Sequence, residues 1–163
     1  TESVCELLDF ELEGELPALE LVADRLNDAL PDGIRVRHIY EAERKIKELH
    51  LLRARVYMEY DGGLPADIEE TVSELLNQET LVVVKHSRKG EAETDIRPLL
   101  KEFVLARLSD HVICLEVLVC AQNPSLNPSL LVDAIASYRP HLRPDFFRIE
   151  RVEIFDVSGE IFR

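Results

Sequence analysis

The sequence has no tryptophan, one methionine and three cysteines, and it lacks any apolar run as long as a membrane helix. A helix that spans a bilayer needs about 20 consecutive apolar residues, and no signal-peptide pattern opens the chain. We therefore expect no membrane segment and a cytoplasmic protein. The cysteines, Cys5, Cys114 and Cys120, cannot all pair, and their spacing suits neither a zinc site nor an iron–sulfur site. We expect reduced core thiols, no metal and no other cofactor.

Basic residues are in deficit as well. The 163 residues include 19 Lys and Arg against 32 Asp and Glu, which gives a formal net charge of −13. Contacts with phosphate need local Lys and Arg, so only local basic patches can bind nucleic acid. The apolar share of 46% is typical of a globular protein with a sizeable core. Met58 is the sole methionine, so we expect a chain that lacks its initiator through processing or because it is a fragment.

The first half of the chain alternates strand and helix patterns. Strands are predicted where apolar and polar residues alternate or β-branched residues gather, at residues 4–13, 34–40, 51–60 and 80–85. Helices are predicted where apolar residues recur at helical spacing after a proline, at residues 17–30 and 65–77. The resulting βαββαβ order predicts a ferredoxin-like α+β half over residues 1–86, with both helices on one face of the sheet.

The second half, residues 87–163, is predicted to be an α+β half rich in hairpins. A turn at residues 88–90 joins strands 81–86 and 92–97, and further elements are strands 103–108, 112–120 and 147–157 and a helix at 129–138. The segment 98–108 can alternatively form a short helix. Neither a repeat nor a linker separates the halves, so we expect them to pack as one unit.

The most specific candidate for function is a basic patch on the first half. If segments 34–40 and 51–60 are neighbouring strands, five side chains emerge on the face opposite the helices: Arg35, Arg37, Arg53, Arg55 and Tyr57. Arginines beside an aromatic ring on an exposed sheet can pair with phosphates and stack on bases of RNA. Alternatively, Arg53 and Arg55 form ordinary cross-strand ion pairs with acidic residues of segment 4–13, namely Asp9, Glu11 and Glu13.

Two further basic groups and one polar loop are candidates. One group lies at the hairpin tip and consists of Lys85, His86, Arg88 and Lys89; the other consists of Arg139, Arg143, Arg148 and Arg151. Each can contact RNA or be a solvated surface. In the loop, two prolines fix the backbone around Gln122, Asn123, Ser125 and Asn127. This loop can read a base or a partner's backbone, or it can serve as the entry to the following helix.

Three stretches are more particular than a secondary-structure pattern: residues 43–46 (Glu-Arg-Lys-Ile), residues 84–98, and residues 121–131, which contain Asn-Pro-Ser-Leu-Asn-Pro. With residues 143–146 and 151–156 they resemble the radical SAM-linked protein family, a bacterial domain of unknown function. The resemblance implies a radical S-adenosylmethionine protein as partner, because members are encoded next to or fused behind one, often near genes of RNA processing and ribosomes. It also implies an N-terminal portion that this chain lacks.

A weaker likeness links residues 26–36 to tRNA pseudouridine synthases, but their Arg-Thr-Asp-Gly type motif is not matched around Asp95, so that activity does not carry over. We find no catalytic motif, and the leading hypothesis is an RNA-associated accessory module of a radical SAM partner. The alternatives are a purely structural or protein-interaction domain, and an enzyme completed by the absent portion with Asp95, Lys85 or Asn123 as candidates. The sequence does not indicate the oligomeric state.

Overall fold

The computed structural model describes residues 2–15, 17–87 and 90–163. The chain divides into two compact units. Residues 1–6 and 47–162 form the larger one, which we call the sheet unit. Residues 7–46, with Arg163, form the smaller one, which we call the helix unit.

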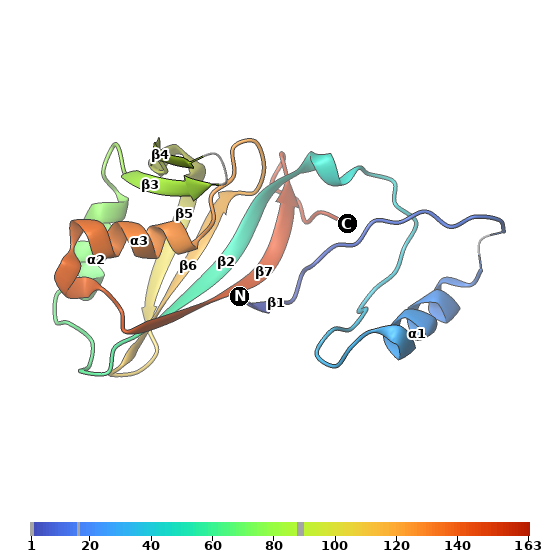
Figure 1. Cartoon of the computed structure of the whole chain (residues 1–163), viewed down its shortest axis with the longest axis horizontal. Helices are drawn as coiled ribbons and strands as arrows, with labels where there is room; N and C mark the ends of the chain where they lie inside the picture. Colours follow the sequence, from blue (N-terminus) through green and yellow to red (C-terminus); the bar gives the residue numbers. More distant parts are fainter. Residues whose placement is uncertain (1, 16, 88–89) are drawn as a thin grey trace. The chain divides into compact units, whose positions relative to one another are not determined.

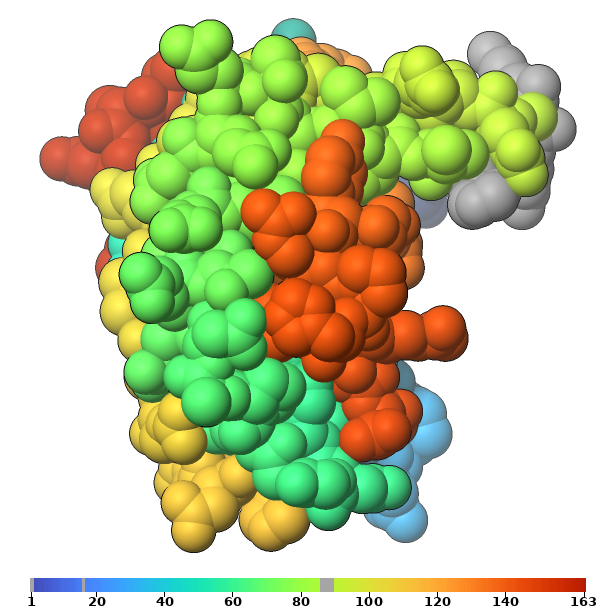
Figure 2. Space-filling view, turned by 90° about the vertical axis from the view of Figure 1, so that its left-hand side faces the viewer, coloured from blue at the N-terminus to red at the C-terminus, as the bar shows by residue number. Residues whose placement is uncertain are grey.

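A mixed sheet is the frame of the sheet unit (Figure 1). Among the described residues it has five strands, in the spatial order β1 (Glu2–Ser3), β7 (Phe146–Asp156), β2 (Leu49–Glu59), β6 (Val112–Cys120) and β5 (Leu100–Arg107). The short β1 runs parallel to β7, and the other neighbours are antiparallel. Two helices, α2 (Ile68–Leu76) and α3 (Ser129–Tyr138), lie side by side on one face, as Figure 2 shows from their side.

After the short β1, and apart from 3₁₀ turns and one hairpin, the elements of this unit follow in the order β2, α2, β5, β6, α3, β7. The βαββαβ order predicted for residues 1–86 is therefore found instead in residues 49–156, with a hairpin inserted between α2 and β5. The predicted α+β class is confirmed. The ferredoxin-like arrangement of residues 1–86 is not found, because β2 pairs with β7 on one edge and β6 on the other and has no free edge for a strand at residues 34–40.

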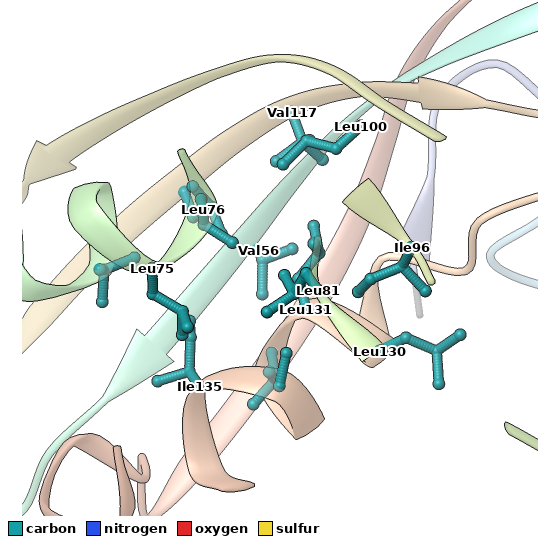
Figure 3. Packing of buried hydrophobic residues seen from close by; sticks show 14 of the residues in the cluster. Val56, Leu75, Leu76, Leu81, Ile96, Leu100, Val117, Leu130, Leu131 and Ile135 are labelled. Carbon is teal, nitrogen blue, oxygen red and sulfur yellow. The ribbon is translucent and has the colours of Figure 1, made fainter. Parts of the chain in front are cut away.

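The core lies between the helices and the sheet. On β2, Ala54, Val56 and Met58 alternate with polar residues, and all three are fully buried. Helix α2 contributes Leu75 and α3 contributes Ile135 to the same cluster, and Figure 3 shows these two side chains close together. Burial of each large apolar side chain stabilises the fold by roughly 1.5–3 kcal/mol, which holds the sheet against both helices.

The elements predicted after residue 100 are confirmed. Strand β6 and helix α3 have the predicted bounds. Strand β7 has the predicted length but begins and ends one residue earlier than residues 147–157. The alternative of a helix over residues 98–108 is wrong, because only one 3₁₀ turn, η2 (Arg97–Leu99), precedes β5. A further 3₁₀ turn, η3 (Pro140–Leu142), connects α3 to the last strand.

The predicted hairpin is present as β3 (Val82–Ser87) paired antiparallel with β4 (Gly90–Asp95). The Asp95 side chain fixes its base, because Asp95 Oδ1 accepts hydrogen bonds from the backbone N–H of Leu81 at 2.8 Å and of Arg97 at 3.0 Å. The predicted boundary between halves at residues 86 and 87 falls inside this hairpin. The two compact units divide near residue 46, where a 3₁₀ turn, η1 (Ile46–Glu48), lies.

The helix unit contains α1 (Leu19–Ala29), close to the predicted helix. Residues 4–13 and 34–40 do not form strands, so the two strands predicted there are wrong. One side chain connects the helix to the second of these segments. The N–H of Val36 donates to Asn27 Oδ1 at 2.8 Å, and Asn27 Nδ2 donates to Val36 O at 3.4 Å.

Candidate functional site

The face of the sheet opposite α2 and α3, which we call the open face, carries the polar side chains of β2. Arg53, Arg55 and Tyr57 alternate with buried residues and therefore lie on this face. This is the position predicted for them. The other two members of the predicted patch, Arg35 and Arg37, belong to the helix unit and do not lie on a strand beside β2.

Carboxylates from both neighbouring strands hold the two arginines. Arg55 Nε donates to Glu116 Oε2 at 2.8 Å, and Arg53 Nη1 donates to Glu116 Oε1 at 3.4 Å. Glu150 lies 3.9 Å from Arg55, and Glu102 lies 3.6 Å from Arg53. The hydrogen bond from Arg55 lowers the pKa of Glu116 from its ordinary value, while partial burial opposes this shift. Glu116 on β6 is thus a shared anion between two guanidinium groups.

Arg53 and Arg55 do form cross-strand ion pairs, as one interpretation of the sequence predicted, but the acidic partners differ from those predicted. Their partners are not the predicted Asp9, Glu11 and Glu13 of the helix unit. The partners are glutamates on β5, β6 and β7. Strands β6 and β7 are the direct neighbours of β2, and β5 lies next to β6, whereas residues 4–13 do not pair with β2.

Tyr57 is also occupied. Its hydroxyl donates to Glu150 Oε2 at 3.2 Å, and the guanidinium carbon of Arg148 lies 3.8 Å from the centre of its ring. Arg148 in turn pairs with Glu2 of β1 at 3.2 Å. Stacking of a nucleic-acid base needs a free ring face, and one face of this ring is covered by a cation.

Beside this network the open face is hollowed. A shallow depression of about 360 Å³ lies over β2, β6 and β5, and its lining residues are Arg55, Tyr57, Val104, Ala106, Leu108, Cys114 and Glu116. Val104 is 64% exposed and Leu108 is 56% exposed, so the rim formed by β5 is apolar and accessible. The depression therefore joins an apolar rim to an ordered ion pair.

The thiol in this depression is not prepared for nucleophilic chemistry. Cys114 is 7% exposed, and burial raises its pKa above the ordinary value. Reactive cysteines instead have a lowered pKa in an electropositive site. Cys114 and Cys120 are buried free thiols, and Cys5 is a half-buried free thiol whose pKa burial also raises.

The other basic groups are placed in different parts of the sheet unit. Lys85 is half-buried on β3. Arg88, Lys89 and the side chain of His86 lie outside the part of the chain that the structure describes. In the third group, Arg148 and Arg151 form ion pairs with Glu2 and Glu6, respectively. Arg139 is half-buried and Arg143 is exposed.

The polar loop before α3 has the contacts of a helix entry. The N–H of Ser129 donates to Asn127 Oδ1 at 3.2 Å, and the N–H of Leu126 donates to Cys120 O at 2.9 Å. Leu126 is buried, whereas Asn123 and Ser125 are exposed. Asn123 has a φ of 39°, in the left-handed region that asparagine tolerates better than most residues. Gln122 is half-buried. These contacts favour the helix-entry interpretation of the loop.

The residues considered for catalysis are not brought together by any contact in the described residues. Asp95 has a structural role at the hairpin base, Lys85 lies on β3, and Asn123 lies in the exposed loop. Within residues 2–15, 17–87 and 90–163, no group of three or more His, Cys, Asp or Glu side chains is arranged to hold a metal ion. Over the same ranges no helix has the length and apolar character needed to cross a bilayer.

Sequence reasoning missed the residues that complete the open face, namely Glu102, Val104, Cys114, Glu116, Glu150 and Glu2. The pattern of residues 112–120 shows that Cys114 and Glu116 share one face, but it does not show that this strand pairs with β2. To find these residues one needs the order of the strands in the sheet, and the local alternation of apolar and polar residues does not show that order.

Comparison with known proteins gives one match. The model of a family described as an uncharacterized protein conserved in bacteria (DUF2344) matches residues 1–128, a range that includes the helix unit, most of the sheet and the polar loop. No curated protein and no solved structure matches the chain. The family description mentions neither a radical SAM protein nor RNA. Because the match covers well over half of the sequence, the chain belongs to this family of uncharacterised bacterial proteins.

Proposed function

We propose that the chain is an accessory module that binds a protein partner through the open face of its sheet. The observation that carries the proposal is the depression between β5, β6 and β2, where exposed Val104 and Leu108 border the ordered pair of Arg55 and Glu116. Protein interfaces combine an apolar centre with aromatic and arginine side chains, and Tyr57 and Arg55 supply both.

The ion pairs around the depression prepare it for binding. A flexible arginine loses conformational entropy when an interface immobilises it, roughly 0.5–1.5 kcal/mol per side chain. Arg55 is already held by Glu116 and Glu150, and Tyr57 is already held by Glu150 and Arg148. A partner that packs on these side chains therefore meets a surface that is ordered in advance.

The charge of the open face supports a protein rather than RNA as its ligand. Its ionic network contains three arginines (Arg53, Arg55 and Arg148) and four glutamates (Glu2, Glu102, Glu116 and Glu150). Binding of a phosphate to any of these arginines has to displace a carboxylate, and the uncovered glutamate then repels the phosphate. Arg53 and Arg55, two of the four patch arginines predicted to hold RNA, are thus neutralised within their own sheet.

The partner that we propose is a radical SAM protein. Support for this choice comes from the sequence resemblance, and in particular from residues 84–98 and 121–131. In this proposal the partner supplies the iron–sulfur cluster and the chemistry, because binding of the cluster needs three closely spaced cysteines and this chain has three widely separated ones.

The experiment is a binding titration between this chain and a radical SAM protein of the kind that the resemblance implies as its partner. Val104→Asp places a charge on the rim of the depression and should weaken the affinity about tenfold or more, which corresponds to about 1.4 kcal/mol. Val157→Asp is the matched control, because Val157 is 78% exposed and lies outside the depression. Equal affinities of both variants, or no binding by the wild type, would contradict the proposal.

RNA association remains a second candidate because of one observation in the helix unit. Arg35 and Arg37 are exposed, and neither forms an ion pair with another described residue. Unlike Arg53 and Arg55, these two arginines are available to a phosphate. In this form the hypothesis predicts RNA contact at residues 34–40 and not at the open face.

A further inference from the structure

The helix unit has apolar side chains but no core. None of its described residues is buried, and seven large apolar residues are among the exposed ones: Leu8 (78%), Phe10 (42%), Leu12 (47%), Leu21 (46%), Ile34 (59%), Tyr40 (41%) and Ile46 (38%). The sheet unit, by contrast, buries an extended cluster. A soluble protein rarely leaves so many large apolar side chains uncovered in one short stretch unless they bind something.

Helix α1 needs this missing contact more than most helices. It has 11 residues, and no side chain caps its N-terminus. Its last turn contains no base and includes Asp28, whose charge is unfavourable near a helix C-terminus. An isolated helix of this length is marginal in water, and its stability in proteins comes mainly from packing of the apolar face. A ligand that packs on the exposed side of α1, where Leu21 lies, would therefore stabilise the helix.

The charges around these apolar residues indicate what the ligand is. Residues 7–33 contain eight carboxylates and one base, Arg25. The carboxylates are Asp9, Glu11, Glu13, Glu15, Glu20, Asp24, Asp28 and Asp32. None of them forms an ion pair with another described residue, whereas Glu102, Glu116 and Glu150 of the sheet unit all do. An acidic apolar surface is complementary to a basic apolar one.

We propose that the helix unit is a docking site for a basic amphipathic segment of a protein partner. The apolar face of that segment packs against Leu21, Phe10 and their exposed neighbours, and its Lys or Arg side chains pair with Asp24, Asp28 and the acidic residues of segment 7–13. Helix-in-groove recognition of this kind uses apolar anchors at helical spacing with charges at the rim. The site is independent of the open face and of the proposed function argued from it.

The test uses the full chain and a defined probe, a synthetic peptide with leucine and lysine at amphipathic helical spacing. A second peptide has glutamate in place of every lysine. We expect the lysine peptide to bind, to lose affinity as salt rises, and to slow amide hydrogen exchange in residues 19–29. The glutamate peptide should do neither. Binding of both peptides, absence of added protection in residues 19–29, or full protection of these amides in the free chain would overturn the proposal.

Variants separate docking from general attraction to an acidic protein. Asp24→Asn combined with Asp28→Asn should weaken binding of the lysine peptide several-fold and cannot act by unfolding α1, since removal of Asp28 relieves an unfavourable charge at the helix end. Glu74→Gln combined with Glu79→Gln is the matched control, with two exposed carboxylates removed from the sheet unit. Leu21→Asp should weaken binding about tenfold, a loss of about 1.4 kcal/mol, whereas Val157→Asp, at an exposed position of the sheet unit outside the depression, should leave it unchanged. Equal losses from the two double variants would reject the site.

Discussion

The guanidinium carbon of Arg148 lies 3.8 Å from the centre of the Tyr57 ring, so a cation from β7 covers an aromatic ring of the central strand β2. Arg148 also pairs with Glu2, which connects the short β1 to the same network. One side chain thus joins three neighbouring strands across the open face. The arrangement makes Arg148 a positioning residue for Tyr57.

Replacement of Arg148 by alanine should lower the free energy of unfolding by about 1 kcal/mol, because it removes a cation–π contact and an exposed ion pair. Urea denaturation measures the change. Arg151→Ala is the control, because its side chain pairs with Glu6 and covers no ring, and it should cost less. Equal destabilisation by the two variants would mean that the contact with Tyr57 contributes nothing.

Glu116 should make stability depend on acid pH. Its folded pKa lies below the unfolded value, since Arg55 donates to the charged carboxylate. The charged form therefore contributes stability above the unfolded glutamate pKa of about 4.3, and the contribution is lost as the pH falls through the lower folded pKa. We expect Glu116→Gln to be less stable than the wild type at neutral pH and the difference to shrink below about pH 4. Chemical denaturation at several pH values measures it, and a difference that is constant with pH would exclude this role.

The polar loop gives a prediction about local structure. Asn127→Ala removes the acceptor for the N–H of Ser129 at the start of α3 and should cost about 1 kcal/mol, the usual net contribution of one hydrogen bond. Ser125→Ala, at an exposed position of the same loop, should have almost no effect. Thermal unfolding of both variants compares them. If Asn127→Ala leaves stability unchanged but abolishes binding to a partner, the loop is a recognition element and not a helix entry.

The order of elements in the sheet unit could be predicted, whereas the arrangement of residues 4–40 could not. Strand β6 forms with its predicted bounds because residues 112–120 are apolar except for Glu116 and find partners on both sides. Residues 34–40 alternate more clearly but find no strand partner. Alternation shows only which side chains share a face, and the backbone hydrogen bonds of a strand need a neighbour that has a free edge.

The same limit applies to the candidate site. That Arg53, Arg55 and Tyr57 share the open face follows from their spacing alone. Their partners do not, since Arg55 and Glu116 are 61 residues apart and Tyr57 and Glu150 are 93 apart. Contacts this distant in sequence depend on strand order, and the strand order observed here differs from the one predicted.

The final prediction decides where RNA binds if it binds at all. Arg35→Ala combined with Arg37→Ala should weaken RNA binding and reduce its salt dependence, because two exposed cations that release counterions are lost. Thermal stability should change by less than about 1 kcal/mol, since neither side chain is buried or ion-paired among the described residues. Arg53→Ala combined with Arg55→Ala is the matched control and should leave RNA affinity unchanged, because glutamates already neutralise these arginines. The measurement is a titration of structured and single-stranded RNA at two salt concentrations. A larger loss in the control would return the RNA site to the open face and contradict the protein-binding role proposed for it, and no wild-type binding at low salt would reject RNA as a ligand of this chain.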